Sequence, residues 1–173
     1  MPTEPLDLIL SRIDSPLTPL LVVSDGEGAL RALEFEDHAP RLHRLLARHY
    51  GAVRLTDGAA PWAVAEALAA YFAGASTALD GLEVRTGGTV FQRRVWAELR
   101  RIPAGTTRTY GQLAAAIGAP SAVRAVGLAN GANPVGVVVP CHRVIGTGGK
   151  LTGYAGGVER KAWLLRHEGA LAA

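Results

Sequence analysis

Apolar residues in the first third of the chain form short runs that are typical of β-strands. The runs lie at residues 6–13 (LDLILSRI), 19–24 (PLLVVS) and 29–36 (ALRALEFE). The DGEG sequence at 25–28 separates the last two and indicates a hairpin turn. Residues 38–50 and 61–73 have apolar positions at helical spacing, and Pro61 suits a helix start. The pattern predicts a small α/β unit.

The second half of the chain has a mainly helical pattern. The turn-rich segment 74–88 is the expected connector, so we predict domains at residues 1–85 and 86–173. A helix is predicted to start at Thr89, and Thr109 with Gln112 forms a potential capping box for the next helix. Gly118 can end that helix, and Ser121 can cap another that extends to residue 131. These two helices fit a helix-turn-helix unit or a plain helical hairpin.

Charge and composition restrict the function classes. The 173 residues carry a net charge of +3, but we count −5 for residues 1–85 and +8 for residues 86–173. A basic second half suits a polyanion such as nucleic acid, although charge alone does not establish this partner. The chain has one cysteine, which excludes an internal disulfide and any Cys-based zinc site. We see no signal peptide and no membrane-spanning run, so a cytoplasmic location is expected.

The segment 133–146 (NPVGVVVPCHRVIG) contains that cysteine, Cys141, directly before His142. Pro140 favours an extended residue before it, so the apolar run 135–139 is predicted to be a buried strand. A catalytic thiol needs a base, and His142 is the candidate, with Glu168 as the group that orients it. Neighbouring strand residues point to opposite faces, so a turn or a bridging water would be required. The alternative is that Cys141 is a small buried apolar residue.

Four stretches together identify a family. They are PCHRVI, the preceding AVGLANGANPV, the following GKLTGYAGGVERKAWLLRHEG, and FQRRVWAELRRIPAGTTRTYGQLA upstream. They closely resemble the 6-O-alkylguanine-DNA alkyltransferases, also called methylated-DNA-protein-cysteine methyltransferases. The resemblance is specific from about residue 71 to residue 169 and weak before that. It implies a ribonuclease H-like N-terminal α/β domain and a mostly helical C-terminal domain of winged helix-turn-helix type.

The resemblance also implies an activity and the residues that perform it. Such proteins flip an alkylated guanine out of duplex DNA and move its alkyl group irreversibly to a cysteine, without a cofactor. They repair 6-O-alkylguanine and, less well, 4-O-alkylthymine. By this resemblance Cys141 is the nucleophile, His142 takes its proton through water and Glu168 orients His142. Tyr110 matches the proton donor to the leaving base, and Asn133 matches the residue that links the helix-turn-helix to the cysteine loop.

DNA contacts follow from the same resemblance. Arg124 matches the arginine finger that enters the minor groove. The small side chain of Ala125 would allow the helix to come close to the DNA. Tyr154 matches a wall of the base pocket. The backbone carbonyls of Cys141 and Val144 would accept from the guanine amino group, and the N–H of Ala155 would reach the alkylated oxygen. Gln92, Gly111 and Thr147 match further family positions that touch the DNA backbone. The nearby cations Lys150, Arg143 and Lys161 are candidates for phosphate contacts, but solvated surface charge explains the two lysines equally well, and a structural role is the alternative for Arg143.

Other interpretations remain at this stage. A non-catalytic protein that recognises alkylated DNA would lack the cysteine, and a winged-helix regulator or a cysteine hydrolase would leave several of these residues without a role. No metal site is predicted, because His38, His43 and His49 lack a plausible further ligand. Asn130 and Ala155 stand where some relatives have an apolar residue and a serine, which leaves tolerance of bulky alkyl groups open. A monomer is expected, with cooperative binding to DNA left open.

Overall fold

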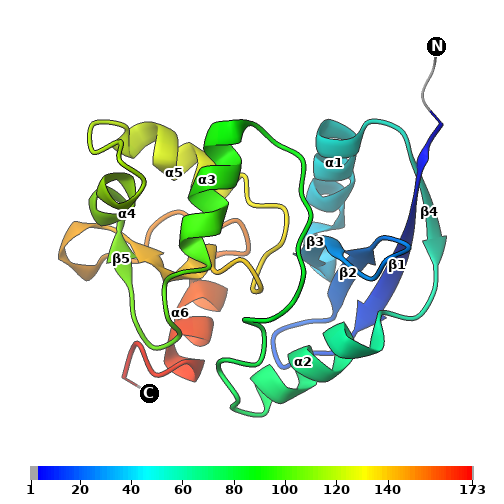
Figure 1. Ribbon diagram of the computed structural model, residues 1–173. Helices are drawn as coiled ribbons and strands as arrows, with labels where there is room; N and C mark the ends of the chain where they lie inside the picture. Colours follow the sequence, from blue (N-terminus) through cyan, green and yellow to red (C-terminus); the bar gives the residue numbers. More distant parts are fainter. Residues whose placement is uncertain (1–3, 173) are drawn as a thin grey trace. The chain divides into compact units, whose positions relative to one another are not determined.

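The computed structural model describes residues 4–172, which divide into two compact units between Gly87 and Gly88 (Figure 1). The first unit contains four strands, two α-helices and one short 3-10 helix. In chain order these are β1 (Leu6–Ile13), β2 (Leu20–Ser24), β3 (Leu30–Phe35), η1 (Glu36–His38), α1 (Ala39–Tyr50), β4 (Val53–Asp57) and α2 (Trp62–Phe72). The predicted strands, hairpin and helices of this unit are confirmed, and Pro61 directly precedes α2.

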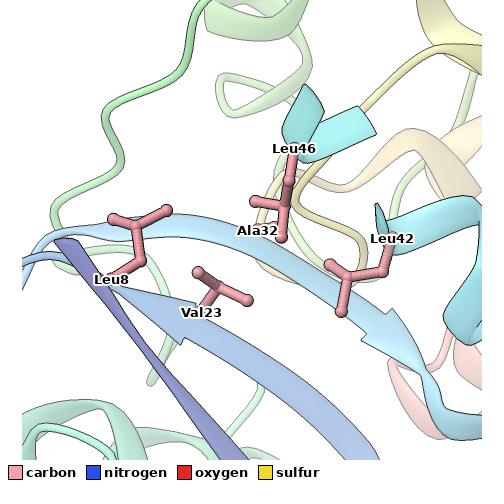
Figure 2. Close-up of a cluster of buried hydrophobic side chains, with 5 residues drawn as sticks. All are labelled: Leu8, Val23, Ala32, Leu42 and Leu46. Atoms are coloured by element: carbon pink, nitrogen blue, oxygen red, sulfur yellow. The ribbon is translucent and has the colours of Figure 1, made fainter. Parts of the chain in front are cut away.

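The strands of the first unit form one sheet in the order β3-β2-β1-β4. β1 pairs antiparallel with β2 and parallel with β4, and α1 lies between β3 and β4 in the chain. One face of the sheet carries a buried apolar cluster against α1, as Figure 2 shows. The cluster consists of Leu8, Val23, Ala32, Leu42 and Leu46. The helix therefore covers this face of the sheet by burying two leucines one turn apart.

Strand β4 was not predicted from the sequence. Its five residues VRLTD are exposed or only half-buried, and the strand lies at the edge of the sheet. The segment has only two apolar residues, Val53 and Leu55, in alternation with polar ones. Two such positions are too few to predict a strand. Its place beside β1 comes from tertiary pairing rather than from local preference.

The second unit is mostly helical and has a two-stranded sheet. It contains α3 (Val90–Leu99), β5 (Arg108–Thr109), α4 (Tyr110–Ala116), α5 (Val123–Gly131), η2 (Cys141–Arg143), β6 (Val144–Ile145), η3 (Thr147–Gly149) and α6 (Val158–His167). β5 and β6 pair in parallel, with Arg108 opposite Val144 and Thr109 opposite Ile145. This pairing brings the start of α4 next to the residues that follow Cys141.

The caps of α4 and α5 differ in how well the sequence predicts them. Thr109 accepts from the backbone N–H of Gln112 at 3.1 Å, and Gln112 accepts from the N–H of Thr109 at 2.8 Å, so the predicted capping box is confirmed. Gly118 follows α4 with a φ of 75°, as its predicted role requires. The predicted Ser121 cap is wrong. A turn bonded from Ala122 N–H to the carbonyl of Ala119 delays the helix by one residue, and Ala122 becomes its N-cap without a side-chain bond.

Helix α3 supports the pair α4 and α5. The indole N–H of Trp96 donates to the carbonyl of Ala129 at 2.8 Å, and a guanidinium N–H of Arg94 donates to the carbonyl of Ile117. Val95, Leu113 and Val126, one from each helix, are completely buried. One side of α5 is thus fixed against the core, which leaves the other side to solvent.

Candidate active site

The segment before Cys141 is buried but is not the predicted strand. Residues 136–139 form turns, and Val137 has a positive φ of 67°, which is rare for a β-branched residue. The side chain of Asn133 bonds the backbone in place of a neighbouring strand. Its Oδ1 accepts from the N–H of Val135 at 3.0 Å, and its Nδ2 donates to the carbonyl of Val139 at 2.8 Å. The run resembles a strand in sequence because its residues are buried and apolar. Local turn hydrogen bonds and the Asn133 side chain, rather than a sheet, satisfy its polar backbone atoms.

Cys141 is the first residue of the 3-10 turn η2 and is 6% exposed. The Nδ2 of Asn133 lies 3.1 Å from the sulfur and donates to it. A donor aimed at sulfur favours the thiolate over the thiol. Because the chain turns between Cys141 and His142, the opposite-face geometry expected for a strand does not apply here.

A buried cluster of polar side chains follows Cys141 in the chain. It consists of His142, Arg143 and Glu168. The Nε2 of His142 lies 2.9 Å from Oε2 of Glu168. Arg143 donates to both oxygens of the same carboxylate at 2.9 Å and to the carbonyl of Ile102 at 2.7 Å. The structure thus brings together His142 and Glu168, which the sequence placed 26 residues apart. Arg143 also belongs to this cluster, which agrees with the structural role that the sequence left open for it beside phosphate contacts.

The protonation states in this cluster follow from burial and charge. Burial lowers the pKa of His142, and Glu168 only partly opposes this effect. Burial alone would raise the pKa of Glu168, but hydrogen bonds from His142 and Arg143 outweigh it and hold that pKa well below its usual range. At neutral pH His142 is therefore neutral and Glu168 is ionised. With the Nε2 proton directed at Glu168, Nδ1 is the proton acceptor, and it has no hydrogen-bond partner within residues 4–172.

Lys161 on α6 is completely buried. Its ammonium group donates to the carbonyl of Val144 and, at 2.8 Å, to the carbonyl of Thr152. Burial lowers the pKa of Lys161 to about 8, although the charge of Cys141 acts in the opposite direction. Lys161 and Arg143 are therefore neither phosphate contacts nor surface charges, because both are buried and donate their hydrogen bonds to carbonyls and a carboxylate within the unit. Of the options that the sequence left open, only the structural role of Arg143 is confirmed. Lys150 is exposed.

Two tyrosines lie near this cluster. Tyr110 is the first residue of α4, and its hydroxyl donates to the carbonyl of Thr152 at 3.4 Å. The ring of Tyr154 lies edge-on to His142, with 6.5 Å between ring centroids and an angle of 73° between planes. A Cβ atom at position 153, where the chain has glycine, would lie 3.6 Å from the Tyr110 hydroxyl oxygen. The loop that carries Thr152, Gly153 and Tyr154 is therefore held between α4 and the His142 cluster.

The exposed side of α5 contains Arg124 and Ala125, both open to solvent. Val123 and Leu128 on the same helix are 40% and 73% exposed, and sequence reasoning did not single them out. Helical spacing could have indicated Leu128, which lies opposite the side formed by Val126, Ala129 and Asn130. Val123 has the same helical spacing as Val126 and Asn130, so its exposure could not be predicted in this way.

The remaining predicted residues have varied environments. The Oε1 of Gln92 accepts from the N–H of Thr89 in a capping box, and the half-buried Ala155 follows Tyr154. Val144 is completely buried, whereas Gly111 and Thr147 are exposed. Asn130 is 2% exposed, its Nδ2 lies 3.5 Å from the carbonyl of Cys141, and its Oδ1 has no hydrogen-bond partner in the described part of the chain.

Neither a metal cluster nor a membrane helix is found in the part of the chain that the structure describes. No group of three or more His, Cys, Asp or Glu residues there is arranged to hold a metal ion. None of the helices between residues 4 and 172 is both long and apolar enough to cross a membrane.

The site combines a buried thiol and its amide donor with a neutral histidine and an ionised glutamate. These groups are typical of a protein that uses a cysteine as a nucleophile. Residues 90–170 match the family model described as the DNA binding domain of 6-O-methylguanine DNA methyltransferase. Residues 8–86 match the model of its ribonuclease-like domain. The chain belongs to the 6-O-methylguanine DNA methyltransferase family.

Relatives match over nearly the whole chain. A methylated-DNA–protein-cysteine methyltransferase of Salmonella typhimurium is 55% identical over 169 residues, which cover 96% of this chain and 98% of the relative. A crystal structure of the Mycobacterium tuberculosis O6-methylguanine methyltransferase matches with a TM-score of 0.79 and 43% identity, covering 96% of this chain and 95% of that one. A structure from the same organism in complex with DNA matches with a TM-score of 0.79 and 44% identity, covering 94% of this chain and 93% of that one.

Proposed function

We propose that this protein repairs alkylated DNA by direct reversal, moving the alkyl group of 6-O-alkylguanine irreversibly to Cys141, once per molecule. The observation that carries the proposal is that the only thiol of the chain accepts from the Asn133 amide and is followed directly by His142, which is paired with Glu168. The names of its relatives support this activity. 4-O-alkylthymine is a poorer substrate, and no cofactor takes part.

The reaction proceeds in one displacement. Nδ1 of His142 takes the thiol proton through a bridging water, while Glu168 keeps the imidazole in the required tautomer. The sulfur electron pair then forms the new S–C bond, and the C–O bond to guanine breaks with its electron pair remaining on the base. Tyr110 gives or shares a proton with a ring nitrogen of the leaving guanine. A thioether is a poor leaving group, so the protein acts once.

The flipped base is held by one aromatic side chain and by backbone groups. Tyr154, which lies near His142, forms a wall of the pocket. The carbonyls of Cys141 and Val144 accept from the guanine amino group, and the N–H of Ala155 reaches the alkylated oxygen. The carbonyl of Val144 already accepts from Lys161, but an sp² oxygen has a second lone pair for the base.

The DNA partner is bound by the second unit. Helices α4 and α5 with the β5–β6 sheet act as a winged helix-turn-helix, and α5 enters the minor groove. Arg124 fills the gap left by the flipped base, which offsets part of the cost of unstacking. Ala125 allows close approach of the helix, and Asn133 joins α5 to the cysteine turn. Gln92, Gly111 and Thr147 contact the DNA backbone.

The domain assignment completes the proposal. Residues 1–85 form a ribonuclease H-like domain, and residues 86–173 form the domain for DNA binding and alkyl transfer. The protein acts as a monomer in the cytoplasm. Repair does not need sequence readout, which agrees with the degenerate contacts that the minor groove offers.

Transfer is expected to add one methyl group to Cys141 and no more. The intact mass of the protein is measured after mixing with excess duplex that carries one 6-O-methylguanine, and peptide mapping locates the methyl group. The Cys141→Ser variant should bind the same duplex without a gain in mass. Tight binding by the native protein without a gain in mass would make it a recognition protein for alkylated DNA instead.

Removing the Arg124 side chain should slow repair of duplex DNA without slowing the chemistry. For Arg124→Ala we expect about a tenfold or greater loss in the rate of methyl transfer from duplex, since the flipped state loses its replacement contact. Transfer from the free base 6-O-methylguanine should stay unchanged. Arg166→Ala removes another exposed arginine, from α6, and serves as the control. Equal losses in the two variants would show that Arg124 contributes only charge.

A further inference from the structure

Asn130 on α5 is a buried polar residue whose side-chain amide has no short hydrogen bond. It is 2% exposed, its Nδ2 lies 3.5 Å from the carbonyl of Cys141, and its Oδ1 has no hydrogen-bond partner among the residues that the structure describes. A contact of 3.5 Å is longer than the roughly 2.7–3.2 Å of ordinary N–H···O bonds. A buried amide in this state is unfavourable, and it gains the missing bond when a ligand brings a donor.

The only other asparagine of the chain shows the contrast. Asn133 is also 2% exposed, but its Oδ1 accepts from the N–H of Val135 at 3.0 Å and its Nδ2 donates to the carbonyl of Val139 at 2.8 Å. These bonds hold the segment before Cys141. Within residues 4–172, Asn130 makes no side-chain bond of comparable length. The packing of the fold therefore does not explain a polar residue at position 130.

The free acceptor of Asn130 lies at the site that the proposed function assigns to the flipped base. Nδ2 and Oδ1 are bonded to the same carbon, so the contact of Nδ2 with the carbonyl of Cys141 places Oδ1 near that carbonyl. Gly127 lies one turn earlier on the same side of α5, and a Cβ atom there would lie 3.8 Å from the ring of Tyr110. The same side of the helix therefore faces both Cys141 and Tyr110, which act on the base in the proposed reaction.

We propose that Asn130 is a specificity-determining residue whose Oδ1 accepts a hydrogen bond from the exocyclic amino group of the alkylated guanine. The inference rests on the proposed function for the identity of the base. Alkylation of the guanine oxygen removes the hydrogen from the neighbouring ring nitrogen, so the amino group is the one N–H donor that the damaged base offers. One of its hydrogens is directed to the carbonyl of Val144, and the other is shared between the oxygens of Cys141 and Asn130 as a three-centre bond.

The same bond favours guanine over thymine. 4-O-alkylthymine has no amino group, and its alkylation likewise removes the hydrogen from the ring nitrogen, so this base offers no N–H donor to Asn130. Its binding would leave Oδ1 buried and unbonded, whereas 6-O-alkylguanine supplies the missing hydrogen bond. Asn130 therefore discriminates between the two bases by a polar contact rather than by the size of the pocket.

The test compares two duplexes, one with 6-O-methylguanine and one with 6-O-methylhypoxanthine, which has the same ring and methyl group but lacks the amino group. Single-turnover rates of methyl transfer give the preference for guanine as a ratio. Asn130→Leu keeps a side chain of similar size but removes Oδ1, so the ratio should fall about three- to tenfold, the effect of losing one hydrogen bond. A native ratio in this variant would overturn the proposal.

The ratio separates recognition of the base from damage to the fold or to the thiol, because such damage slows both substrates alike. Asn130→Ala removes the same oxygen without filling its space and should lower the ratio too, so the test does not depend on whether leucine fits. Arg124→Ala, on the same helix, should slow both substrates and keep the native ratio. Transfer from neither duplex by the native protein would overturn the proposed function as well, whereas transfer with one ratio in all variants would overturn only the role of Asn130.

Discussion

The Glu168→Gln variant is expected to lose about 3–5 kcal/mol of stability, the usual cost of removing one partner of a buried ion pair. The native carboxylate accepts two hydrogen bonds from Arg143 and one from His142. A glutamine keeps the shape but leaves the buried guanidinium without a counter-charge. Its amide nitrogen would also face a donor of Arg143 or of His142. Urea denaturation at pH 7 measures the loss.

The same substitution should change how stability depends on pH. The pKa of Glu168 is lower in the folded state than the ~4.3 of an unfolded glutamate, so its contribution is complete above that value. The contribution is lost as the pH falls below ~4.3 toward the lower folded pKa, because the unfolded chain takes up the proton first. The stability gap between native protein and Glu168→Gln should therefore narrow below about pH 4.

A control on the same helix separates this cluster from a general effect of charge. Glu159 is an exposed carboxylate in the first turn of α6, where substitution costs only about 0.3–1 kcal/mol. Glu159→Gln should leave the rate of methyl transfer unchanged. Glu168→Gln should slow it, since His142 loses the acceptor that sets its tautomer. Native-like stability and transfer in Glu168→Gln would remove Glu168 from the proposed site.

The parts of the fold that the sequence predicted well depend on neighbours in the chain. The capping box of Thr109 and Gln112 joins residues three positions apart, and it was correct with its partners. The turn at 25–28 is likewise local, since the Asp25 carboxylate accepts from the N–H groups of Glu27 and Ala29. Such bonds join residues close together in the chain, so a sequence pattern can place them, although the equally local Ser121 cap was predicted wrongly.

The parts that sequence reasoning missed depend on contacts from distant segments. Residues 135–139 have the apolar run of a buried strand, but Asn133 bonds their backbone and no regular strand forms. Lys161 looks like a surface cation, yet carbonyls 17 and 9 positions earlier in the chain bind its ammonium. An apolar run indicates burial without specifying the backbone, and a lysine does not reveal its acceptors.

Asn133 organises the cysteine segment, so Asn133→Ala is expected to damage both stability and transfer. The variant leaves the buried N–H of Val135 without its acceptor, for a loss of roughly 1–3 kcal/mol, and removes one of two hydrogen bonds to the carbonyl of Val139, which still accepts from the N–H of Cys141. It also removes the donor 3.1 Å from the sulfur of Cys141. A displaced thiolate should slow methyl transfer about 100-fold, as misplacement of a reacting group commonly does. Thermal unfolding and single-turnover transfer measure the two effects.

Asn130→Ala is the matched control, because both asparagines are buried and 2% exposed. The Oδ1 of Asn130 has no hydrogen-bond partner within residues 4–172, and its Nδ2 makes only a long contact of 3.5 Å. The same chemical change should therefore cost less stability at position 130 than at position 133. If the two variants lose equal stability, the bonds of Asn133 do not hold the segment. If Asn133→Ala transfers methyl groups at the native rate, the thiolate needs neither its donor nor the fixed turn.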